Sequence, residues 1–494
     1  MKYSISKKIL FILILLLLSI FSNGQYVVFF AIWIFMAMLL FVSRKSPRWP
    51  GFILVLLLTS ISSYIGFDFV PFMPLLISII SSLIFGLFAS LPYLIDSCFL
   101  KKRHSFLSTL IFPCLVVLFE YAYHQFNSYG TFGHLAYTQQ SQLILIQSVS
   151  VFGLGYITFL IAWFASVSNW IYEQRNEWKN IKKAILIYSF VMGFTLVYGS
   201  YRLQFQKPIS ETIRIASISA LDSLQVAVDV PGLNNEETKE DLKIKTRRNT
   251  SELNQYLFDK SIKEANAGAK IVFWAEGNGT VLKEDEQKLY KKASQTASNH
   301  DIYLGIAIAV FDHTNPKYLE NKFILFDNDG NIIIDYWKGI SVPGVEAPIS
   351  NNKTTGIQKV ETDYGIISGV ICFDLDFPNY LKQAKGSDIF LAPSNDWKEI
   401  DPIHTDMSKF RAIEQGFNFI RQTSFGLSIG TDYTGKVISE MDHYTAEDKV
   451  LITQLPTKGI TTIYSKIGDI FIGFCLLSFI SSTIILRRKQ NCKN

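Results

Sequence analysis

The chain has 494 residues, of which 49% are hydrophobic and 18% are charged, and its formal net charge is +5. It is too apolar for an ordinary soluble enzyme and too highly charged for a bundle of membrane helices alone, so the composition predicts two parts. A net charge this small does not indicate a nucleic-acid partner.

Eight apolar stretches predict membrane-spanning helices, because most are near the roughly 20 residues that a helix needs to cross a bilayer core. The first could also be a signal peptide, but no small-residue cleavage site follows it and another apolar stretch starts almost at once. We therefore expect a membrane domain of seven helices over residues 1–201, and an eighth helix with a basic tail over residues 467–494. The stretches are residues 9–22, 26–42, 51–67, 72–95, 106–123, 142–167, 183–200 and 467–486.

Basic residues occur in every second connection between these stretches. The connections SNGQ, FDFVP and residues 124–142 contain no lysine or arginine. The positive-inside rule then places both chain ends in the cytoplasm and residues 202–466 outside it. The basic residues are Lys2, Lys7, Lys8, Arg44, Lys45, Arg48, Lys101, Lys102, Arg103, Arg175, Lys179, Lys182, Lys183, Arg487, Arg488 and Lys489.

Two ionisable side chains, Glu120 and His124, lie at the outer end of the fifth stretch. They could line a polar site within the membrane domain. They could equally face the water at the membrane interface, and their position near the end of the span favours this simpler interpretation.

Residues 202–466 are long enough for one domain with a full core. Short β-rich runs such as IRIASISA, KIVFWAE and SDIFLAPS alternate with amphipathic stretches near residues 236–266, 283–298 and 403–418. DNDG and DYTG provide the turns of two hairpins. The pattern predicts a layered α/β domain with a mixed sheet.

Of the five cysteines, only Cys372 belongs to this domain, because Cys98, Cys114 and Cys475 lie in or beside apolar stretches and Cys492 lies in the tail. A disulfide within the domain is therefore excluded. A metal site is not expected, since no His/Cys cluster with ligand spacing occurs. Cys372 is then either a buried structural thiol or a nucleophile.

Three apolar runs end in a side chain that can carry chemistry: KIVFWAE in Glu276, IIIDYWK in Lys338 and GVIC in Cys372. Singly, these residues could be an exposed carboxylate, a surface ammonium and a structural thiol. Together they are less easily accidental, because α/β folds present functional groups at the ends of their strands.

The three residue types form a complete set for acyl transfer. A carboxylate can deprotonate a thiol, which is a poor nucleophile until it becomes a thiolate. The oxyanion formed by attack on an acyl carbon needs positive charge or N–H donors, which Lys338 and the backbone N–H of Phe373 could provide. The same carboxylate, once protonated, can return its proton to the leaving group.

The order WAE, NKFILFDNDGNIIIDYWK and GVICFDLDFP resembles the nitrilase superfamily, whose Glu-Lys-Cys triad lies on an α-β-β-α sandwich. Seven apolar spans, such a domain and a last span together resemble the apolipoprotein N-acyltransferase family. SVPGVEAP, which contains Glu346, APSNDW with the segment that follows it, and TTIYSKIGD are similar to further segments of that family. The chain departs from the family pattern at Ala275, where proline is usual, and at Phe373 and Asp374, where tyrosine and glutamate are usual.

The resemblance implies a reaction in two steps, in which Cys372 takes an acyl chain from a membrane phospholipid and passes it to the amine of a lipoprotein's diacylglyceryl-modified N-terminal cysteine. Glu276 would be the base, Lys338 and the Phe373 N–H the oxyanion partners, and Glu346 and Asp374 supporting residues. No cofactor is implied, and the expected location is the bacterial cytoplasmic (inner) membrane. Other functions stay open. One is a membrane-tethered carbon-nitrogen hydrolase or an acyltransferase that acts on a different amide or amine, and another is a non-catalytic extracytoplasmic binding domain.

Overall fold

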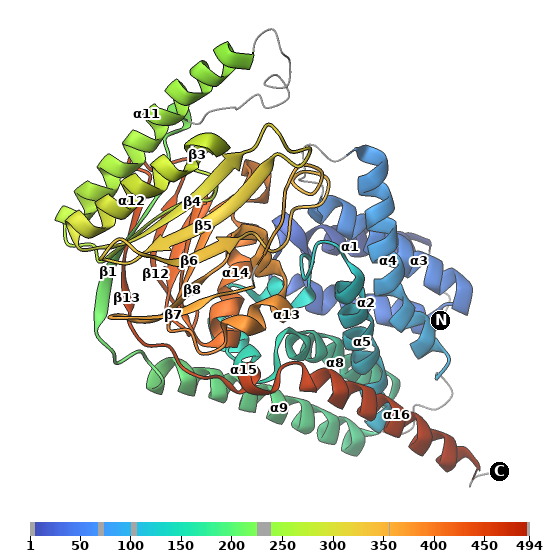
Figure 1. Cartoon of the computed structure of the whole chain (residues 1–494). Coiled ribbons are helices and arrows are strands. Elements are labelled where there is room, and N and C mark those ends of the chain that lie inside the picture. The colour runs from blue at the N-terminus through green and yellow to red at the C-terminus, as the bar shows by residue number, and fades with distance from the viewer. Residues whose placement is uncertain (1–4, 68–73, 100–105, 225–238, 355, 492–494) are drawn as a thin grey trace. The chain divides into compact units, whose positions relative to one another are not determined.

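The computed structural model describes residues 5–67, 74–99, 106–224, 239–354 and 356–491 (Figure 1). Lys2, Lys101, Lys102, Arg103 and Cys492, which entered the sequence predictions, lie outside these ranges. The chain divides into two compact units. The helical unit comprises Met1–Gln206 and Lys466–Asn494, and the α/β unit comprises Lys207–Ser465.

Five helical segments of the described chain are long and apolar enough to cross a membrane, judged by length and composition: Arg48–Phe67, Leu75–Ser97, Phe106–Phe126, Leu154–Glu173 and Trp178–Phe205. The other predicted spans fall on shorter apolar helices, so the total of eight spans stays a prediction. The helices of this unit are α1 (Ile5–Phe21), α2 (Ala31–Lys45), α3 (Arg48–Phe67), α4 (Leu75–Ser97), α5 (Ile111–Phe126), α6 (Leu143–Ile146), α7 (Val149–Phe152), α8 (Leu154–Glu173), α9 (Trp178–Phe205) and α16 (Ile470–Asn491).

The apolar stretch 142–167 is not one helix. It is broken into α6, α7 and α8, and Gly153 separates the last two with a φ of +70°, a conformation that glycine adopts without steric cost. The helix that could span a membrane therefore starts at Leu154 and not at residue 142. Lys179, Lys182 and Lys183, expected in a loop, lie in the first turns of α9.

Arg44, predicted as a loop charge, is buried in the last turn of α2 and pairs with Asp96 of α4. Its Nε lies 3.0 Å from Asp96 Oδ2 and one terminal nitrogen lies 3.1 Å from Oδ1. Two parallel bonds of this kind match the planar fork of arginine to a carboxylate. Arg44 therefore joins two helices.

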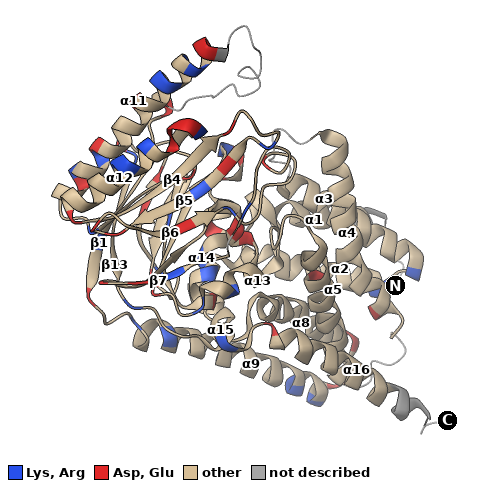
Figure 2. Ribbon diagram, in the orientation of Figure 1, with Lys and Arg blue, Asp and Glu red and all other residues tan. Residues whose placement is uncertain are grey.

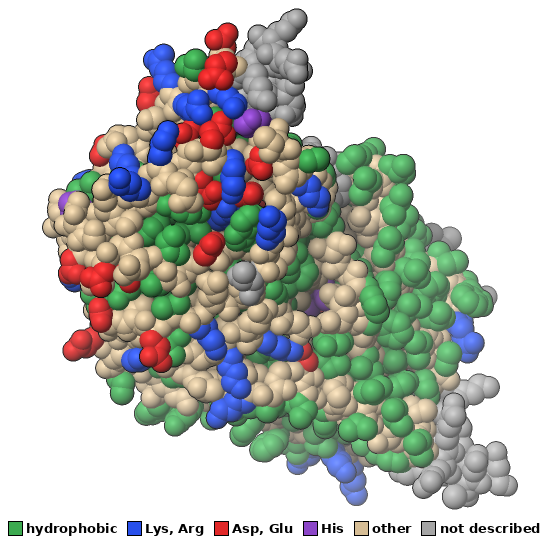
Figure 3. Space-filling view, viewed as in Figure 1, with side chains coloured by type: hydrophobic (Ala, Val, Ile, Leu, Met, Phe, Trp, Pro, Cys, Tyr) green, Lys and Arg blue, Asp and Glu red, His purple; other side chains and the backbone are tan. Residues whose placement is uncertain are grey.

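The surface of the helical unit is strongly apolar. Figure 2 shows few charged residues along its helices, and Figure 3 shows apolar side chains over them. Exposed side chains include Ile53 on α3, Leu76 on α4 and Phe190 on α9. An apolar surface this extensive does not face water in a soluble protein, and lipid contact explains it.

The α/β unit contains two sheets. The first has the order β13-β1-β2-β4-β5-β6, with β3 paired to β4, and the second has the order β12-β11-β10-β9-β8-β7. The strands are β1 (Thr212–Ile218), β2 (Ile271–Trp274), β3 (Gly279–Leu282), β4 (Tyr303–Phe311), β5 (Leu319–Phe326), β6 (Ile332–Trp337), β7 (Lys359–Thr362), β8 (Gly365–Gly369), β9 (Ile389–Asn395), β10 (Asn418–Ser424), β11 (Leu427–Thr431), β12 (Val437–Asp442) and β13 (Val450–Pro456).

Four layers make up this unit. Helices α11 (Lys239–Asn266) and α12 (Glu286–His300) cover the first sheet, whereas α14 (Ile403–Gln415) and the short α13 (Pro378–Leu381) lie against the second (Figure 1). One apolar core fills the space between the sheets, and another lies beneath α11 and α12. The result is an α-β-β-α sandwich, and the helix α15 (Ile463–Ile467) follows it.

The two predicted hairpins are confirmed. The Asp327 N–H donates to the Asn331 carbonyl at 2.9 Å between β5 and β6, and the Asp432 N–H donates to the Lys436 carbonyl at 3.1 Å between β11 and β12. Strands β3, β7 and β13 were not predicted.

The directions of the strands place two of the predicted catalytic residues at the same edge of the first sheet. β2 is parallel to β4, while β5 is antiparallel to both β4 and β6, so β2 and β6 run the same way. The carboxyl ends of β2 and β6, where Glu276 and Lys338 follow, therefore lie at the same edge of the first sheet. β8, β9 and β10 are mutually parallel in the second sheet.

Candidate active site

Lys338 lies between two carboxylates. Its Nζ donates to Glu276 Oε1 at 2.7 Å and to Glu346 Oε1 at 2.7 Å. Only 2% of the Lys338 surface and 4% of the Glu276 surface is exposed, so water screens this contact little. Glu346 belongs to the loop after β6, and its other carboxylate oxygen accepts the Val342 N–H at 3.0 Å. The structure thus brings together three of the predicted residues.

Asn321, which the sequence did not indicate, completes this cluster. It lies on β5, and its Nδ2 donates to Glu276 Oε1 at 2.8 Å and to Glu346 Oε1 at 3.4 Å. Its backbone carbonyl accepts the Lys338 N–H at 2.9 Å. Asn321 therefore holds both the carboxylate of Glu276 and the backbone of Lys338.

Cys372 begins a short turn of 3₁₀-helix (Cys372–Asp376) after β8, and its φ is +47°. A left-handed backbone is uncommon for a non-glycine residue, and such strain concentrates at functional sites. Its Sγ is 3.7 Å from the Asn395 carbonyl oxygen, and the residue is buried. The sharp turn presents the thiol at the carboxyl ends of the strands.

Asp374 connects the cysteine turn to the lysine loop. Its Oδ2 accepts the Ile371 N–H at 3.1 Å and the Tyr336 hydroxyl at 2.6 Å, and its Oδ1 accepts the Ile340 N–H at 2.8 Å. Burial raises the pKa of Asp374 to about 7, although these donors favour the carboxylate. Asp374 therefore holds the turn that contains Cys372 against the loop that follows Lys338. Phe373 is also buried, and its ring packs edge-on against Phe377 at 5.2 Å.

The electrostatics differ between the three predicted catalytic residues. Burial raises the pKa of Glu276, against the opposing charge of Lys338. Burial favours a neutral Lys338, but Glu276 and Glu346 outweigh it and hold the pKa of that ammonium well above its usual range. Burial, then the charge of Glu276, raises the pKa of the Cys372 thiol, whereas Lys338 lowers it. Glu276 is therefore suited to accept a proton, and Lys338 to stay charged.

A second cluster, also missed by the sequence, lies behind the thiol. Asp396, after β9, accepts two bonds of 3.0 Å from Arg421 on β10. His404 on α14 has its Nδ1 2.8 Å from Asp396 Oδ1 and its Nε2 3.2 Å from Asp376 Oδ1. All four side chains are buried. The APSNDW and HTDM segments carried only a family similarity, and nothing in their pattern indicated this contact.

Cys372, Asp396 and His404 each offer a metal-ligand atom, and these atoms lie within 4.8 Å of one another. The sequence had not indicated such a cluster. The donor set does not fit a cation, because an Arg421 nitrogen already lies 3.0 Å from His404 Nδ1 and the carboxylate of Asp396 is paired with that arginine. We derive no metal chemistry from it.

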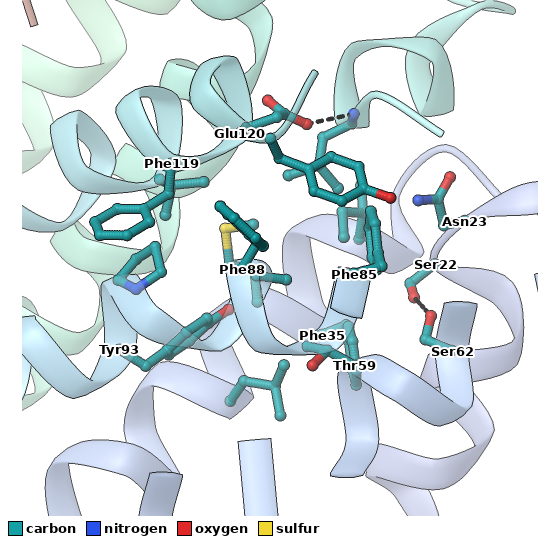
Figure 4. A pocket seen from close by; sticks show the side chains of 18 residues that line it. Ser22, Asn23, Phe35, Thr59, Ser62, Phe85, Phe88, Tyr93, Phe119 and Glu120 are labelled. Carbon is teal, nitrogen blue, oxygen red and sulfur yellow. Dashed lines mark hydrogen bonds between the residues drawn. The ribbon is translucent and has the colours of Figure 1, made fainter. Parts of the chain in front are cut away.

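The helical unit contains an apolar pocket of about 70 Å³, shown in Figure 4, several times the roughly 10–15 Å³ that one water needs. Aromatic rings from α2, α4 and α5 surround it, including Phe35, Phe88 and Phe119. Glu120 lies at its border, where one carboxylate oxygen accepts the Leu135 N–H at 2.7 Å and the other accepts the Thr158 hydroxyl at 2.6 Å. Glu120 thus joins α5 to neighbouring elements.

Comparisons with known proteins give separate matches for the helical unit and the α/β unit. Residues 14–167 match the sequence model of the apolipoprotein N-acyltransferase N-terminal domain, and residues 252–464 match that of carbon-nitrogen hydrolases. An apolipoprotein N-acyltransferase of Borreliella burgdorferi is 23% identical over 71% of this chain and 70% of its own length. Apolipoprotein N-acyltransferase 1 of Treponema denticola is 24% identical over 85% of this chain and 84% of its own.

Among solved structures, an amidase from Nesterenkonia sp. aligns over 51% of this chain and 93% of its own, with 15% identity and a TM-score of 0.41.

The chain thus joins a carbon-nitrogen hydrolase domain to a bundle of membrane-type helices, and it is a membrane protein. The N-terminal sequence model and the long relatives all carry the name of one family. It belongs to the apolipoprotein N-acyltransferases.

Proposed function

We propose that this protein is an N-acyltransferase that moves a fatty acyl chain from a membrane phospholipid, through a thioester on Cys372, to the N-terminal amine of diacylglyceryl-cysteine in lipoproteins. The observation that carries the proposal is the buried contact of Lys338 with Glu276 and Glu346, together with a cysteine in a strained turn whose pKa the charges of Glu276 and Lys338 influence. The names of the relatives, which cover most of the chain, support the choice of reaction.

In the first step, Glu276 takes the proton of the Cys372 thiol and the sulfur attacks the ester carbonyl of the phospholipid. Lys338, with the Phe373 N–H, stabilises the oxyanion. A C–S bond forms, the C–O bond to glycerol breaks, and Glu276 returns the proton to the leaving oxygen, which releases a lysophospholipid.

In the second step, the amine of the acceptor cysteine attacks the thioester. A C–N bond forms and the C–S bond breaks, while the amine proton passes through Glu276 to the sulfur. Glu346 and Asn321 keep Glu276 and Lys338 in place through the contacts described above.

The proposed setting is the bacterial cytoplasmic (inner) membrane, with both termini in the cytoplasm and the catalytic domain outside it. The proposed organisation is seven spans over residues 1–201, the catalytic domain over residues 202–466 and an eighth span over residues 467–494. The apolar surface of the helices supports membrane residence, and the pocket lined by Phe35, Phe88 and Phe119 is suited to hydrocarbon.

A transfer assay tests the acceptor. The full-length protein with phospholipid is given a diacylglyceryl-cysteine peptide, and the same peptide with an acetylated amine is the control. We expect the free-amine peptide alone to gain a fatty-acyl mass, and Glu276→Gln to abolish the gain. Release of free fatty acid with no gain by the peptide would contradict the proposal and support a membrane-tethered hydrolase.

A further inference from the structure

The proposed mechanism does not use the four charged groups behind Cys372: Asp376, Asp396, His404 and Arg421. They come from four separate segments, namely the turn after β8, the end of β9, helix α14 and strand β10. None is more than 7% exposed. Buried charges are retained only when they are paired, so the way in which these four balance one another has consequences for the thiol beside them.

The hydrogen-bond geometry favours a doubly protonated His404. A carboxylate oxygen lies beside each ring nitrogen, at 2.8 Å from Nδ1 and 3.2 Å from Nε2. A neutral imidazole has only one N–H, so one carboxylate would face a lone pair. The Arg421 nitrogen that lies 3.0 Å from Nδ1 also lies 3.0 Å from Asp396 Oδ1, to which it can donate, and the Asp396 oxygen is nearer to Nδ1 at 2.8 Å. Both carboxylate contacts are hydrogen bonds only if both ring nitrogens carry protons, so this pairing favours an imidazolium.

With a charged ring, the two carboxylates balance the imidazolium and the guanidinium, and the cluster is neutral. With a neutral ring, one negative charge remains uncompensated in a cluster of which Asp396 and His404 each place one atom within 4.8 Å of the sulfur. That charge opposes formation of a thiolate.

We propose that His404 is a positioning residue that acts through Cys372: held as an imidazolium by Asp376 and Asp396, it keeps the buried charge beside the sulfur balanced so that the thiolate can form. This inference rests on the proposed role of Cys372 as the nucleophile. It assigns His404 no contact with either substrate.

Other charged groups also lie near Cys372 and His404. Glu276, Lys338, Asp396 and Arg421 all influence the pKa of Cys372. On the approach to α14, Asp401 accepts the Leu427 N–H at 2.7 Å, and within α14 Asp406 pairs with Lys409 at 2.7 Å. Burial lowers the pKa of His404, but Asp376 and Asp396 outweigh it and raise the pKa to about 9. The ring therefore keeps its charge through neutral pH.

The test is the rate of Cys372 alkylation by iodoacetamide, measured from pH 5.5 to 10 in the full-length protein in detergent. Mass spectrometry of the Cys372 peptide separates it from the other cysteines. We expect His404→Gln to react at least about ten-fold more slowly near pH 7. Above about pH 9 the wild-type ring loses its proton, so the two rates should converge.

A double variant separates charge balance from a structural role. Asp376→Asn/His404→Gln removes one negative and one positive charge together, so its rate should return to within about three-fold of the wild type. Asp376→Asn alone should react no more slowly than the wild type. If His404 had a purely structural role, adding Asp376→Asn to His404→Gln would not restore the alkylation rate of Cys372.

Two results would overturn the inference. The first is a wild-type pH profile in His404→Gln, and the second is a double variant as slow as the single variant. Both leave the proposed function intact, provided that wild-type Cys372 itself shows pH-dependent alkylation. A wild-type Cys372 whose alkylation does not change with pH would instead contradict its role as a thiolate nucleophile, and this inference with it.

Discussion

At the scale of single residues, the site depends on a buried ammonium shared by two carboxylates. Lys338 stays charged because Glu276 and Glu346 both contact its Nζ at 2.7 Å. Burial at the same time raises the pKa of Glu276, which makes it a better acceptor for the proton of a thiol. In the proposed mechanism, Glu276 therefore transfers the proton and Lys338 stabilises the oxyanion.

Substitutions at Asn321 test this division. Asn321→Ala removes one donor from Glu276, and we expect acyl transfer to slow about ten-fold, the loss typical of one charge-assisted hydrogen bond. Asn321→Asp adds a third carboxylate beside Glu276 and Glu346 and should slow the reaction further. The measurement is the single-turnover rate of acyl-enzyme formation. An Asn321→Asp rate equal to or above that of Asn321→Ala would contradict the charge argument.

The sequence pattern predicted some residues of this site and missed others. Glu276, Lys338 and Cys372 could be singled out because each ends an apolar run, and the contact between Glu276 and Lys338 required only that their runs be strands of one sheet. Asn321 lies inside β5, and His404 lies in the first turn of α14. Their roles depend on how the strands pair and how the sheets pack. The periodicity of apolar residues and the composition do not predict either.

At the scale of elements, the regular strands and helices follow from their patterns, and the misses have identifiable causes. β7 has four residues, none of them buried, so no apolar run marks it. The break between α7 and α8 depends on the backbone of Gly153, which hydrophobicity does not report. Arg44 and Asp96 are 52 positions apart in the sequence. The pattern of basic residues between apolar stretches therefore could not show that Arg44 pairs with a carboxylate of another helix.

The Arg44–Asp96 pair provides a test of helix packing. Asp96→Asn leaves the buried guanidinium without its carboxylate, and we expect a loss of about 3–5 kcal/mol in stability. The double variant Arg44→Met/Asp96→Leu removes both charges and should be less destabilised than the single variant. Thermal unfolding of the three proteins in the same detergent measures this. A double variant that is less stable than Asp96→Asn would contradict a simple ion pair between α2 and α4.

At the scale of the whole molecule, the chain combines helices whose surface suits lipid with a domain whose site suits acyl transfer. A hydrolase of small soluble amides needs no such helices, whereas a donor and an acceptor that both reside in the membrane explain them. We therefore predict that Cys372 carries an acyl chain taken from a lipid.

The most direct measurement is the intact mass of the full-length protein in phospholipid micelles, with Cys372→Ala in parallel. We predict that the wild type gains one fatty-acyl mass, that Cys372→Ala gains none, and that hydroxylamine, which cleaves thioesters, removes the adduct. An unchanged wild-type mass with every phospholipid tested, or an equal gain in Cys372→Ala, would contradict the account.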